Sequence, residues 1–520
     1  MLERVFDFAI VGSGPSALSA ISQIPTGKKV LVVDRGLDIP KEILDSQEVF
    51  RREFSLQDKR NRRNVKNIDK STWDLKTYWG SDFIYEPKDN LPYESRAKGG
   101  FSNVWGATCF PPPLKIINQM NESTKTNYLE SLKFIERMID VSWCGNPAEC
   151  YPRCGNENSY LQEIFHLGKC QEFVGQKEFH ESSVYWEPTR LGVSKKVISR
   201  DGLQFRDCVD CGACQIGCPF GIVWNSWPKF RGEMLRLGAT YIQGNLVSFR
   251  EIEGKVEIAI SSGSKITQKY INRLLLTGGV LSTSKILIRS NYIAEAKIRD
   301  SQTAVVYGFT KVQKDNKNNF NNLNFPRVSF LFDLKSATLG LQLYLISDYI
   351  LRRGTGNISM PDFMYKWLRK FLQNWMFVGL VYFDSNVSSS IKIIRNKISI
   401  IRSDKRVRDK MYKQMRKQFR ILGIRLGRFR REMSVGGGYH FMGNFFPGNF
   451  WKNENLLMNN GFQKLTELSS ISETSRVHIL DASIQTHMPT GSVTVGVMAQ
   501  VALLTKKIVD FDEQAVKFSD

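Results

Sequence analysis

The chain has 520 residues, of which 42% are hydrophobic and 12% aromatic, so it can bury more than one core and is not a largely disordered protein. The formal net charge is +22, and half of this excess lies between residues 402 and 431, where thirteen Lys and Arg accompany two Asp. Such a surface favours phosphates or anionic lipid, whereas the lack of a base-reading motif in the sequence argues against nucleic acid as a partner.

We recognise no export signal and no membrane-spanning segment in the sequence. Glu3, Arg4 and Asp7 interrupt the first apolar stretch, and no cleavage site follows it. The apolar run at 375–383 has nine residues, whereas about twenty are needed to cross a bilayer as a helix. Nine cysteines without an export signal suggest thiols that stay reduced. We therefore expect a cytoplasmic protein, with peripheral contact at the inner face of the membrane as an alternative.

Residues 5–34 have the order of a dinucleotide-binding β-α-β unit. An apolar strand leads into Gly12-x-Gly14-x-x-Ala17, an apolar helix follows, and a second strand ends at Asp34. Gly12 permits a tight turn, Gly14 lets the backbone approach a pyrophosphate, and Ala17 replaces the third glycine. Asp34 is placed to accept hydrogen bonds from a ribose. The alternative is a tight turn that binds no ligand.

A second glycine-rich turn covers residues 98–106. It combines glycines with small polar residues, namely Gly99, Gly100, Ser102, Asn103 and Gly106. A loop of this composition can run close to a flat cofactor, although a plain turn would look the same.

Four cysteines fall within eleven residues, at Cys208, Cys211, Cys214 and Cys218. Gaps of two residues let the backbone curl around an iron–sulfur cube. Cys218 is then the fourth ligand, or it is not a ligand, which leaves a three-iron cluster, or it is replaced by another thiol. Zinc suits the same spacing, and a structural turn without metal is the third interpretation.

A buried strand at 274–277 ends in the paired glycines Gly278 and Gly279, and a helix-like stretch follows. This strand-glycine-helix order makes Gly278 a further candidate for contact with the same nucleotide. On its own, the pattern is again compatible with a plain turn.

Two amphipathic helices are predicted in the middle of the chain. Residues 363–375 carry an apolar stripe that includes Trp367 and Phe371, and such a stripe usually packs into a core. Residues 402–431 read as a basic helix with an apolar face. Trp, Lys and Arg on such helices also suit the interface of an anionic membrane.

Taken in order, these segments resemble the glucose-methanol-choline family of FAD-dependent oxidoreductases. The start of the chain, the turn at 99–106 and the element at 275–287 are similar to the family's FAD contacts. Tyr439-His440-Phe441-Met442-Gly443 resembles its His-x-x-Gly active-site motif, and Asp481-Ala482-Ser483 its Asp-Ala-Ser segment near the flavin. The chain departs from the pattern at Asn444, where the family usually has Thr.

The resemblance implies that residues from both ends of the chain and from its middle bind the cofactor. These residues would be Gly12, Gly14, Ala17, Asp34, Arg35, Gly99, Gly100, Ser102, Asn103, Gly106, Val247, Gly278, Asp481, Ala482 and Thr494. The helix at 493–504 is apolar nearly all round, as a buried helix would be. In the family its N-terminus points at the flavin and stabilises charge on the reduced ring.

Alcohol oxidation by a flavin requires a base that removes the hydroxyl proton as hydride leaves. We expect His440 to be this base, because imidazole titrates near neutral pH without a large shift. A second group would orient the hydroxyl. Either Thr490 takes the family's second position, or His487 does so through a shifted loop.

We therefore predict an α/β protein with a Rossmann-like FAD-binding domain and a second substrate domain built on an antiparallel sheet. The discontinuous FAD-binding domain would comprise 1–45, 90–110, 205–300 and 436–520, and the substrate domain 46–89, 111–204 and 301–435. The predicted reaction is oxidation of the CH–OH group of an alcohol, sugar or sugar-lipid by an FAD-dependent dehydrogenase or oxidase. Its electrons would pass to oxygen, a quinone or an acceptor protein.

Two other interpretations remain open from the sequence. The first is an electron-transfer module in which flavin and an iron–sulfur cluster serve a partner protein. The second is a non-catalytic, FAD-stabilised protein that binds lipid or nucleic acid through its basic segment.

Overall fold

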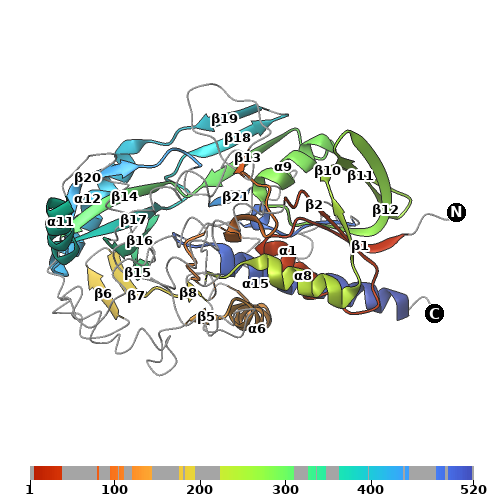
Figure 1. The fold of residues 1–520 in the computed structure, drawn as a ribbon, viewed down its shortest axis with the longest axis horizontal. Coiled ribbons are helices and arrows are strands. Elements are labelled where there is room, and N and C mark those ends of the chain that lie inside the picture. The colour runs from red at the N-terminus through yellow and green to blue at the C-terminus, as the bar shows by residue number, and fades with distance from the viewer. Residues whose placement is uncertain are drawn as a thin grey trace.

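The structure is a computed structural model in which two sheet-based units lie side by side (Figure 1). The residues it describes are 5–37, 79–80, 94–103, 105–110, 117, 120–142, 175–179, 182–193, 223–309, 326–334, 337–346, 362–395, 397–436, 440–443, 476–485 and 490–517.

The first unit is built on a seven-stranded sheet with the order β10-β11-β12-β1-β2-β9, in which β22 also pairs with β12. Pairing is parallel among β22, β12, β1, β2 and β9, and antiparallel among β10, β11 and β12. The apolar runs of β1 and β2 are buried on both faces, as central parallel strands require. The strands are β1 (Phe6–Val11), β2 (Val30–Asp34), β9 (Thr240–Gln243), β10 (Asn245–Ile252), β11 (Lys255–Ser262), β12 (Lys265–Leu276) and β22 (Val477–Ile479).

Helices cover both faces of this sheet. Figure 1 shows α1, α8 and α15 together on one side of it and α9 on the other. The described helices of this unit are α1 (Pro15–Ile21), α6 (Glu122–Ile139), α8 (Ser226–Leu237), α9 (Val280–Arg289) and α15 (Thr494–Lys517). α15 is buried along its first turns, as the apolar run at 493–504 predicts, and it continues to Lys517.

The second unit is built on an antiparallel seven-stranded sheet with the order β20-β14-β17-β16-β15-β7-β6. Phe419 of α12 packs against Phe330 and Phe332 on one face of this sheet, with ring centroids 4.8 and 5.0 Å apart. Leu372 of α11 packs against the opposite face. The elements are β6 (Gly175–Phe179), β7 (Ser182–Pro188), β14 (Thr303–Phe309), β15 (Pro326–Leu334), β16 (Ala337–Leu345), α11 (Asp362–Trp375), β17 (Met376–Phe383), α12 (Lys405–Ile421) and β20 (Arg425–Glu432).

A four-stranded antiparallel sheet with the order β19-β18-β13-β21 links the two units. Shorter pieces complete the described structure. These elements are β3 (Trp79–Gly80), β4 (Glu94–Ser95), η2 (Gly100–Asn103), β5 (Val141–Ser142), β8 (Leu191–Gly192), β13 (Glu295–Asp300), β18 (Ser390–Ile394), β19 (Lys397–Ile401), β21 (Phe441–Gly443) and η5 (Ala482–Ile484).

The predicted fold class is confirmed, because a Rossmann-like parallel sheet is joined to a unit built on an antiparallel sheet. The exact boundaries of the two domains stay a prediction. Among the residues described, no helix is both long and apolar enough to cross a membrane.

Two expectations for the middle of the chain are wrong. The basic helix ends at Ile421, and Arg425–Glu432 forms the edge strand β20, because it pairs with β14. The apolar stripe of α11 does not pack as a whole into a core either, since Leu372 packs against the sheet but Trp367 is 68% exposed and Phe363 73% exposed.

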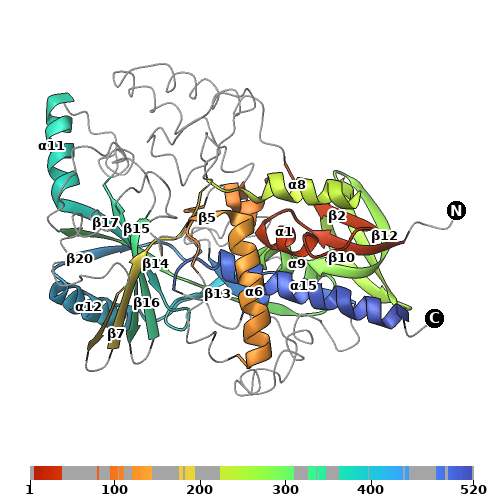
Figure 2. The same cartoon turned by 90° about the horizontal axis from the view of Figure 1, so that it is seen from below.

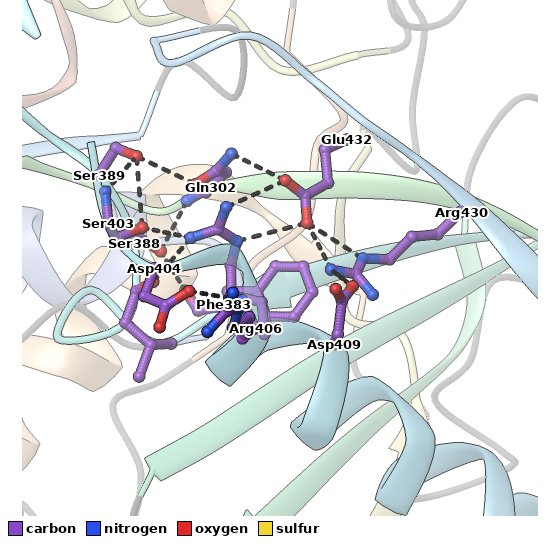
Figure 3. A network of polar contacts seen from close by, with 12 residues as sticks. Gln302, Phe383, Ser388, Ser389, Ser403, Asp404, Arg406, Asp409, Arg430 and Glu432 are labelled. Carbon is purple, nitrogen blue, oxygen red and sulfur yellow. Dashed lines mark hydrogen bonds and ion pairs between the residues drawn. The ribbon is translucent and has the colours of Figure 1, made fainter.

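An ionic network fixes α12 to the antiparallel sheet (Figure 3). The Arg408 guanidinium is buried, and its Nη2 donates to Glu432 Oε2 at 3.1 Å. Arg430 Nε donates to the other oxygen of the same carboxylate at 3.1 Å, and its Nη2 lies 2.7 Å from Asp409. Burial alone would raise the pKa of Glu432, but the hydrogen bonds and charges of both arginines outweigh it and hold that pKa below its ordinary value. Acidic side chains of the protein itself thus neutralise part of the positive charge of residues 402–431.

We expect Glu432→Gln to lower the free energy of unfolding by about 3 kcal/mol, because it leaves the buried Arg408 without its counter-ion. The contribution of Glu432 should be present at neutral pH and should be lost as the pH falls through its lowered pKa, since the unfolded carboxyl takes up its proton first. Urea unfolding measures both effects. Glu295→Gln is the control, because Glu295 pairs with Lys392 at an exposed site and should contribute about 0.5 kcal/mol or less. Equal free energies of unfolding for the two variants would show that the Arg408–Glu432 interaction does not stabilise the protein.

Candidate nucleotide-binding and active site

The predicted cofactor residues meet at one edge of the parallel sheet. Gly12 follows β1, Asp34 ends β2, Gly278 follows β12 and Asp481 follows β22. These strands are parallel neighbours, so their carboxyl ends lie together. In open α/β sheets, this edge is where ligands bind.

The first glycine turn allows close approach of the backbone. Gly12 has φ +94°, and a Cβ placed on it would lie 3.4 Å from the Gly278 Cα atom. A Cβ on Gly14 would meet nothing within 4 Å, which leaves room for a ligand beside this backbone. Ala17 is fully buried in the core beneath the turn.

The second glycine turn is held against the first by buried hydroxyls. Gly99 N donates to Ser13 Oγ at 3.0 Å, and Ser226 Oγ donates to the carbonyl oxygens of Ser13 and Gly99, each at 3.1 Å. Ser102 Oγ donates to Gly99 O at 2.6 Å and accepts from Ser226 N at 3.0 Å. Sequence reasoning missed Ser226, because a single serine at a helix start carries no motif. A Cβ on Gly100 would lie 3.4 Å from the Gly14 Cα atom, so the two turns touch.

Asn103 closes the second turn on itself. Its Nδ2 donates to the carbonyl oxygens of Lys98 and Gly100, both at 2.8 Å, while Asn225 donates to its Oδ1. Gly106 lies just beyond this turn and is partly buried. The turn is therefore preorganised by the protein itself.

Asp34 lies within the same cluster, where its carboxylate accepts a hydrogen bond from Ser13 Oγ. Burial raises the pKa of Asp34 to about 6, and hydrogen bonds from Ser13 and the Gly36 backbone together with the charge of Lys98 oppose that rise. At pH 7 the carboxylate is mostly ionised, so it can accept hydrogen bonds from a ribose.

Arg35 is held by an ionic cluster that the sequence did not indicate. Its Nε donates to Asn245 Oδ1 at 3.2 Å, and its Nη1 lies 3.3 Å from Glu94 Oε2. The same oxygen of Glu94 accepts from Lys285 Nζ of α9 at 2.8 Å. Val247 lies two residues beyond Asn245, at a β-bulge in β10.

Asp481 joins the carboxyl-terminal segment to the turn after β12. Its Oδ2 accepts from Thr283 Oγ1 of α9 at 2.5 Å. Its Oδ1 accepts from Ser483 N at 2.8 Å, so Asp481 is the N-cap of η5, which begins at Ala482. Burial raises the pKa of Asp481, and these hydrogen bonds oppose the rise. Thr494 is the first residue of α15, which packs against α1.

His440 lies immediately before β21 and stacks on Tyr382 of the antiparallel sheet, with ring centroids 5.6 Å apart and planes at 15°. Its Nδ1 has no hydrogen-bond partner in the described structure. Burial lowers the pKa of His440 to about 4, which corrects the expectation of an unshifted imidazole. The ring is therefore neutral at pH 7, and the same burial makes it a weaker base than a solvated imidazole.

Thr490 reaches the same part of the antiparallel sheet. A Cβ placed on Gly340 would lie 2.2 Å from the Thr490 carbonyl oxygen, so the two backbones are in close contact. Gly340 is the cross-strand partner of Tyr382, on which His440 stacks. Thr490 Oγ1 is buried without a partner in the described structure, whereas His487 lies outside the described residues.

Asp300 is a residue near His440 that sequence reasoning missed. It is fully buried, and its Oδ2 accepts from Gly436 N at 2.8 Å, just before the segment that leads to His440. On the other side, Ser301 N donates to His440 O at 3.3 Å, and Phe441 pairs with Asp300 between β21 and β13. Burial raises the pKa of Asp300 to about 7, opposed by backbone hydrogen bonds from Gly436 and Ser301. An isolated Asp at a strand end has no sequence signature.

The candidate metal ligands Cys208, Cys211, Cys214 and Cys218 all lie outside the described residues, so the iron–sulfur and zinc alternatives stay predictions. Within the described ranges, no group of three or more His, Cys, Asp or Glu could hold a metal ion. Cys109 is fully buried, and burial raises the pKa of its thiol far above the ordinary value.

Comparison with known proteins adds a structural likeness alone. No protein-family model matches the chain, and no curated protein matches its sequence. Among solved structures, the chain is similar to the crystal structure of pyridoxine 4-oxidase from Mesorbium loti, with a TM-score of 0.49 and 11% sequence identity. The alignment covers 96% of this chain and 99% of that chain. A likeness this distant assigns no activity.

We expect His440 to stay neutral at every pH from neutrality down to about 4, because burial disfavours its charged form. Nitrogen-detected NMR of histidine-labelled protein, with His440→Gln to assign the signal, measures this directly. Since an unfolded histidine titrates near pH 6.5, the contribution of His440 to the free energy of unfolding should fall as the pH drops from about 6.5 to about 4. Titration of the His440 signal near pH 6.5 would show that the ring is solvated.

Proposed function

We propose that this protein is an FAD-dependent oxidoreductase that oxidises the CH–OH group of an alcohol. The observation that carries the proposal is the meeting of Gly12, Asp34, Gly278 and Asp481 at one edge of the parallel sheet. These residues lie far apart in the sequence, and a dinucleotide site explains why they come together.

The residues present fit an adenine dinucleotide. Gly14 leaves open space beside its backbone, and Gly99 and Gly100 have φ of +85° and +61°, which residues with a Cβ rarely adopt. Asp34 supplies a carboxylate for ribose hydroxyls at the end of the second strand. The space beside the two glycine turns, which we call the cradle, is therefore lined by the backbone of these turns and by the Asp34 carboxylate. A pyrophosphate requires close backbone N–H groups, and a ribose requires an acceptor for its hydroxyls.

His440 would act as the base of the reaction. When bound, the flavin supplies a two-electron acceptor for the hydride that leaves the substrate carbon. The neutral imidazole of His440 would take the hydroxyl proton, so that the alcohol becomes a carbonyl compound. Thr490 would orient the substrate through the hydroxyl that has no partner in the described structure.

The residues behind His440 support a polar substrate such as a sugar or a sugar-lipid. The hydroxyls of Tyr344 and Tyr382 both donate to Gln342 Oε1 at 3.0 Å, and Gln342 Nε2 is buried without a partner among the described residues. An unpaired buried donor is costly, and a substrate oxygen is a suitable acceptor for it. Oxygen, a quinone and a protein remain equal candidates for the electron acceptor.

Asp34→Ala should weaken FAD binding about 30-fold, because a hydrogen bond to a charged group contributes about 2 kcal/mol. Quenching of flavin fluorescence during titration of the apoprotein measures the affinity. Asp7→Ala is the matched control, since Asp7 lies at the opposite end of the same sheet, where it accepts from Lys29 N at an exposed site. Equal affinity of the two variants would place the nucleotide elsewhere.

His440→Ala should retain FAD and reduce the rate of flavin reduction by alcohols about 100-fold or more, because a positioned base is lost.

Gly340→Ala should also slow the reaction without loss of FAD, since the new methyl group displaces Thr490. Gly232→Ala is its control, because a Cβ there meets nothing within 4 Å. Stopped-flow absorbance under anaerobic conditions, with a panel of alcohols and sugars, gives the rates.

These variants also separate the alternative functions. An electron-transfer module would bind FAD and show no reduction by any alcohol in the panel, while a partner protein would reduce it. Unchanged reduction by alcohols in His440→Ala would remove this histidine from the mechanism.

A further inference from the structure

The helix α11 presents an aromatic stripe to solvent. Phe363 is 73% exposed, Trp367 68%, Phe371 48% and Trp375 45%, and they follow one another at intervals of four residues. The rings of Trp367 and Phe371 stack with their centroids 5.8 Å apart and their planes at 9°. Soluble proteins rarely expose so many large apolar side chains on one element without a partner.

This stripe is not the face by which α11 attaches to the protein. Leu372 makes that contact, packing with Tyr344, Ile346 and Val378 on the antiparallel sheet. The helix therefore has an inner apolar face that the sheet covers and an outer aromatic face that nothing in the described structure covers. Packing among the described residues does not explain the outer face.

The aromatic surface continues from α11 onto the sheet. Phe309 is the cross-strand partner of Met376, the residue that follows Trp375, and it is 49% exposed. On its other side Phe309 pairs with Arg425 of the edge strand β20. On the same edge strand, Phe429 is 91% exposed.

Positive charge borders these aromatic side chains. Arg425 and Arg428 of β20 are exposed, unlike Arg408 and Arg430, which the internal network engages. Aromatic side chains beside exposed arginines match the interface of an anionic bilayer, where rings enter the headgroup region and cations meet lipid phosphates.

The position of α11 in the molecule also favours a bilayer. Figure 2 shows α11 projecting at the end of the molecule, on the side of the antiparallel sheet opposite α12. A projecting helix can insert its outer face into a flat membrane.

We propose that the aromatic–arginine surface, formed by Phe309, Phe363, Trp367, Phe371, Trp375, Arg425 and Arg428, binds anionic lipid bilayers peripherally. The aromatic rings supply apolar burial, and the arginines select phosphate headgroups. Contact through this surface places the bilayer on the face of the antiparallel sheet that also carries Tyr382 and His440. The proposal does not depend on the oxidoreductase activity.

Co-sedimentation of the full chain with lipid vesicles tests the proposal. Vesicles of equal parts phosphatidylcholine and phosphatidylglycerol should bind the protein, whereas pure phosphatidylcholine should bind it at least tenfold more weakly. The double variant Trp367→Gln/Phe371→Gln should bind the anionic vesicles about tenfold more weakly, because both rings lose their contact with the membrane. The double variant Arg425→Gln/Arg428→Gln should lose a similar part of its affinity for anionic vesicles. High salt should weaken the binding of the wild-type protein to these vesicles.

The control changes equally exposed residues elsewhere. Leu235→Gln/Lys265→Gln alters an apolar side chain of α8 that is 73% exposed and an exposed lysine of β12, and it should bind vesicles like the wild type. Thermal unfolding of all variants checks that each is folded. Failure of the wild type to bind either vesicle, or unchanged binding by the Trp367/Phe371 variant, would overturn the proposal. Tight binding to oligonucleotides that needs the arginines but not the aromatic rings would also overturn it.

Discussion

The contact between the two glycine turns is the constraint on which the site depends. Ser226 donates to both Ser13 O and Gly99 O, and Ser13 Oγ links Gly99 N to the Asp34 carboxylate. A buried hydrogen bond of this kind contributes about 1 kcal/mol, and the single Ser226 hydroxyl proton is shared between its two carbonyl partners, so that the two loops are held together. The protein's own groups thus hold the two turns in contact, and such preorganisation lowers the entropic cost of binding a ligand.

The second half of the site depends on how the antiparallel sheet approaches this cradle. Gly340 lets the backbone of Thr490 touch the sheet, and Tyr382 provides the ring on which His440 stacks. Asp300 holds the chain on both sides of that histidine. Two separate units thus supply the glycine turns of the proposed nucleotide site and the ring that packs against the proposed base, His440.

The parts of this arrangement that were predictable from the sequence are local. The strand before Gly12 and the strand that ends at Asp34 follow from continuous apolar runs and a glycine turn, which need no distant partner. Ser226 and Asp300 gave no signal, because their roles come from contacts with residues far away in the sequence. The lowered pKa of His440 could not be predicted from the sequence either, since its cause is burial, and burial depends on the whole fold. The basic and apolar pattern of residues 402–431 indicates one helix, but Arg425–Glu432 forms the strand β20, because pairing with β14 overrides the local pattern.

The pattern of α11 illustrates a different limit of sequence reasoning. An apolar stripe shows that one face of a helix avoids water, but it does not say whether protein or membrane covers that face. Here Leu372 serves the internal contact and Trp367 faces outward, a distinction that only the packed structure reveals.

Hydrogen–deuterium exchange of the apoprotein with and without FAD shows which segments surround the flavin dinucleotide, because it reports on each segment separately. We expect slower exchange on FAD addition at 12–18, 98–103, 278–283 and 481–485, and also at 440–443, with unchanged exchange in α11 and α12. Slower exchange confined to other segments, or no response to FAD at the two glycine turns, would contradict the proposal that these turns and His440 surround one flavin dinucleotide.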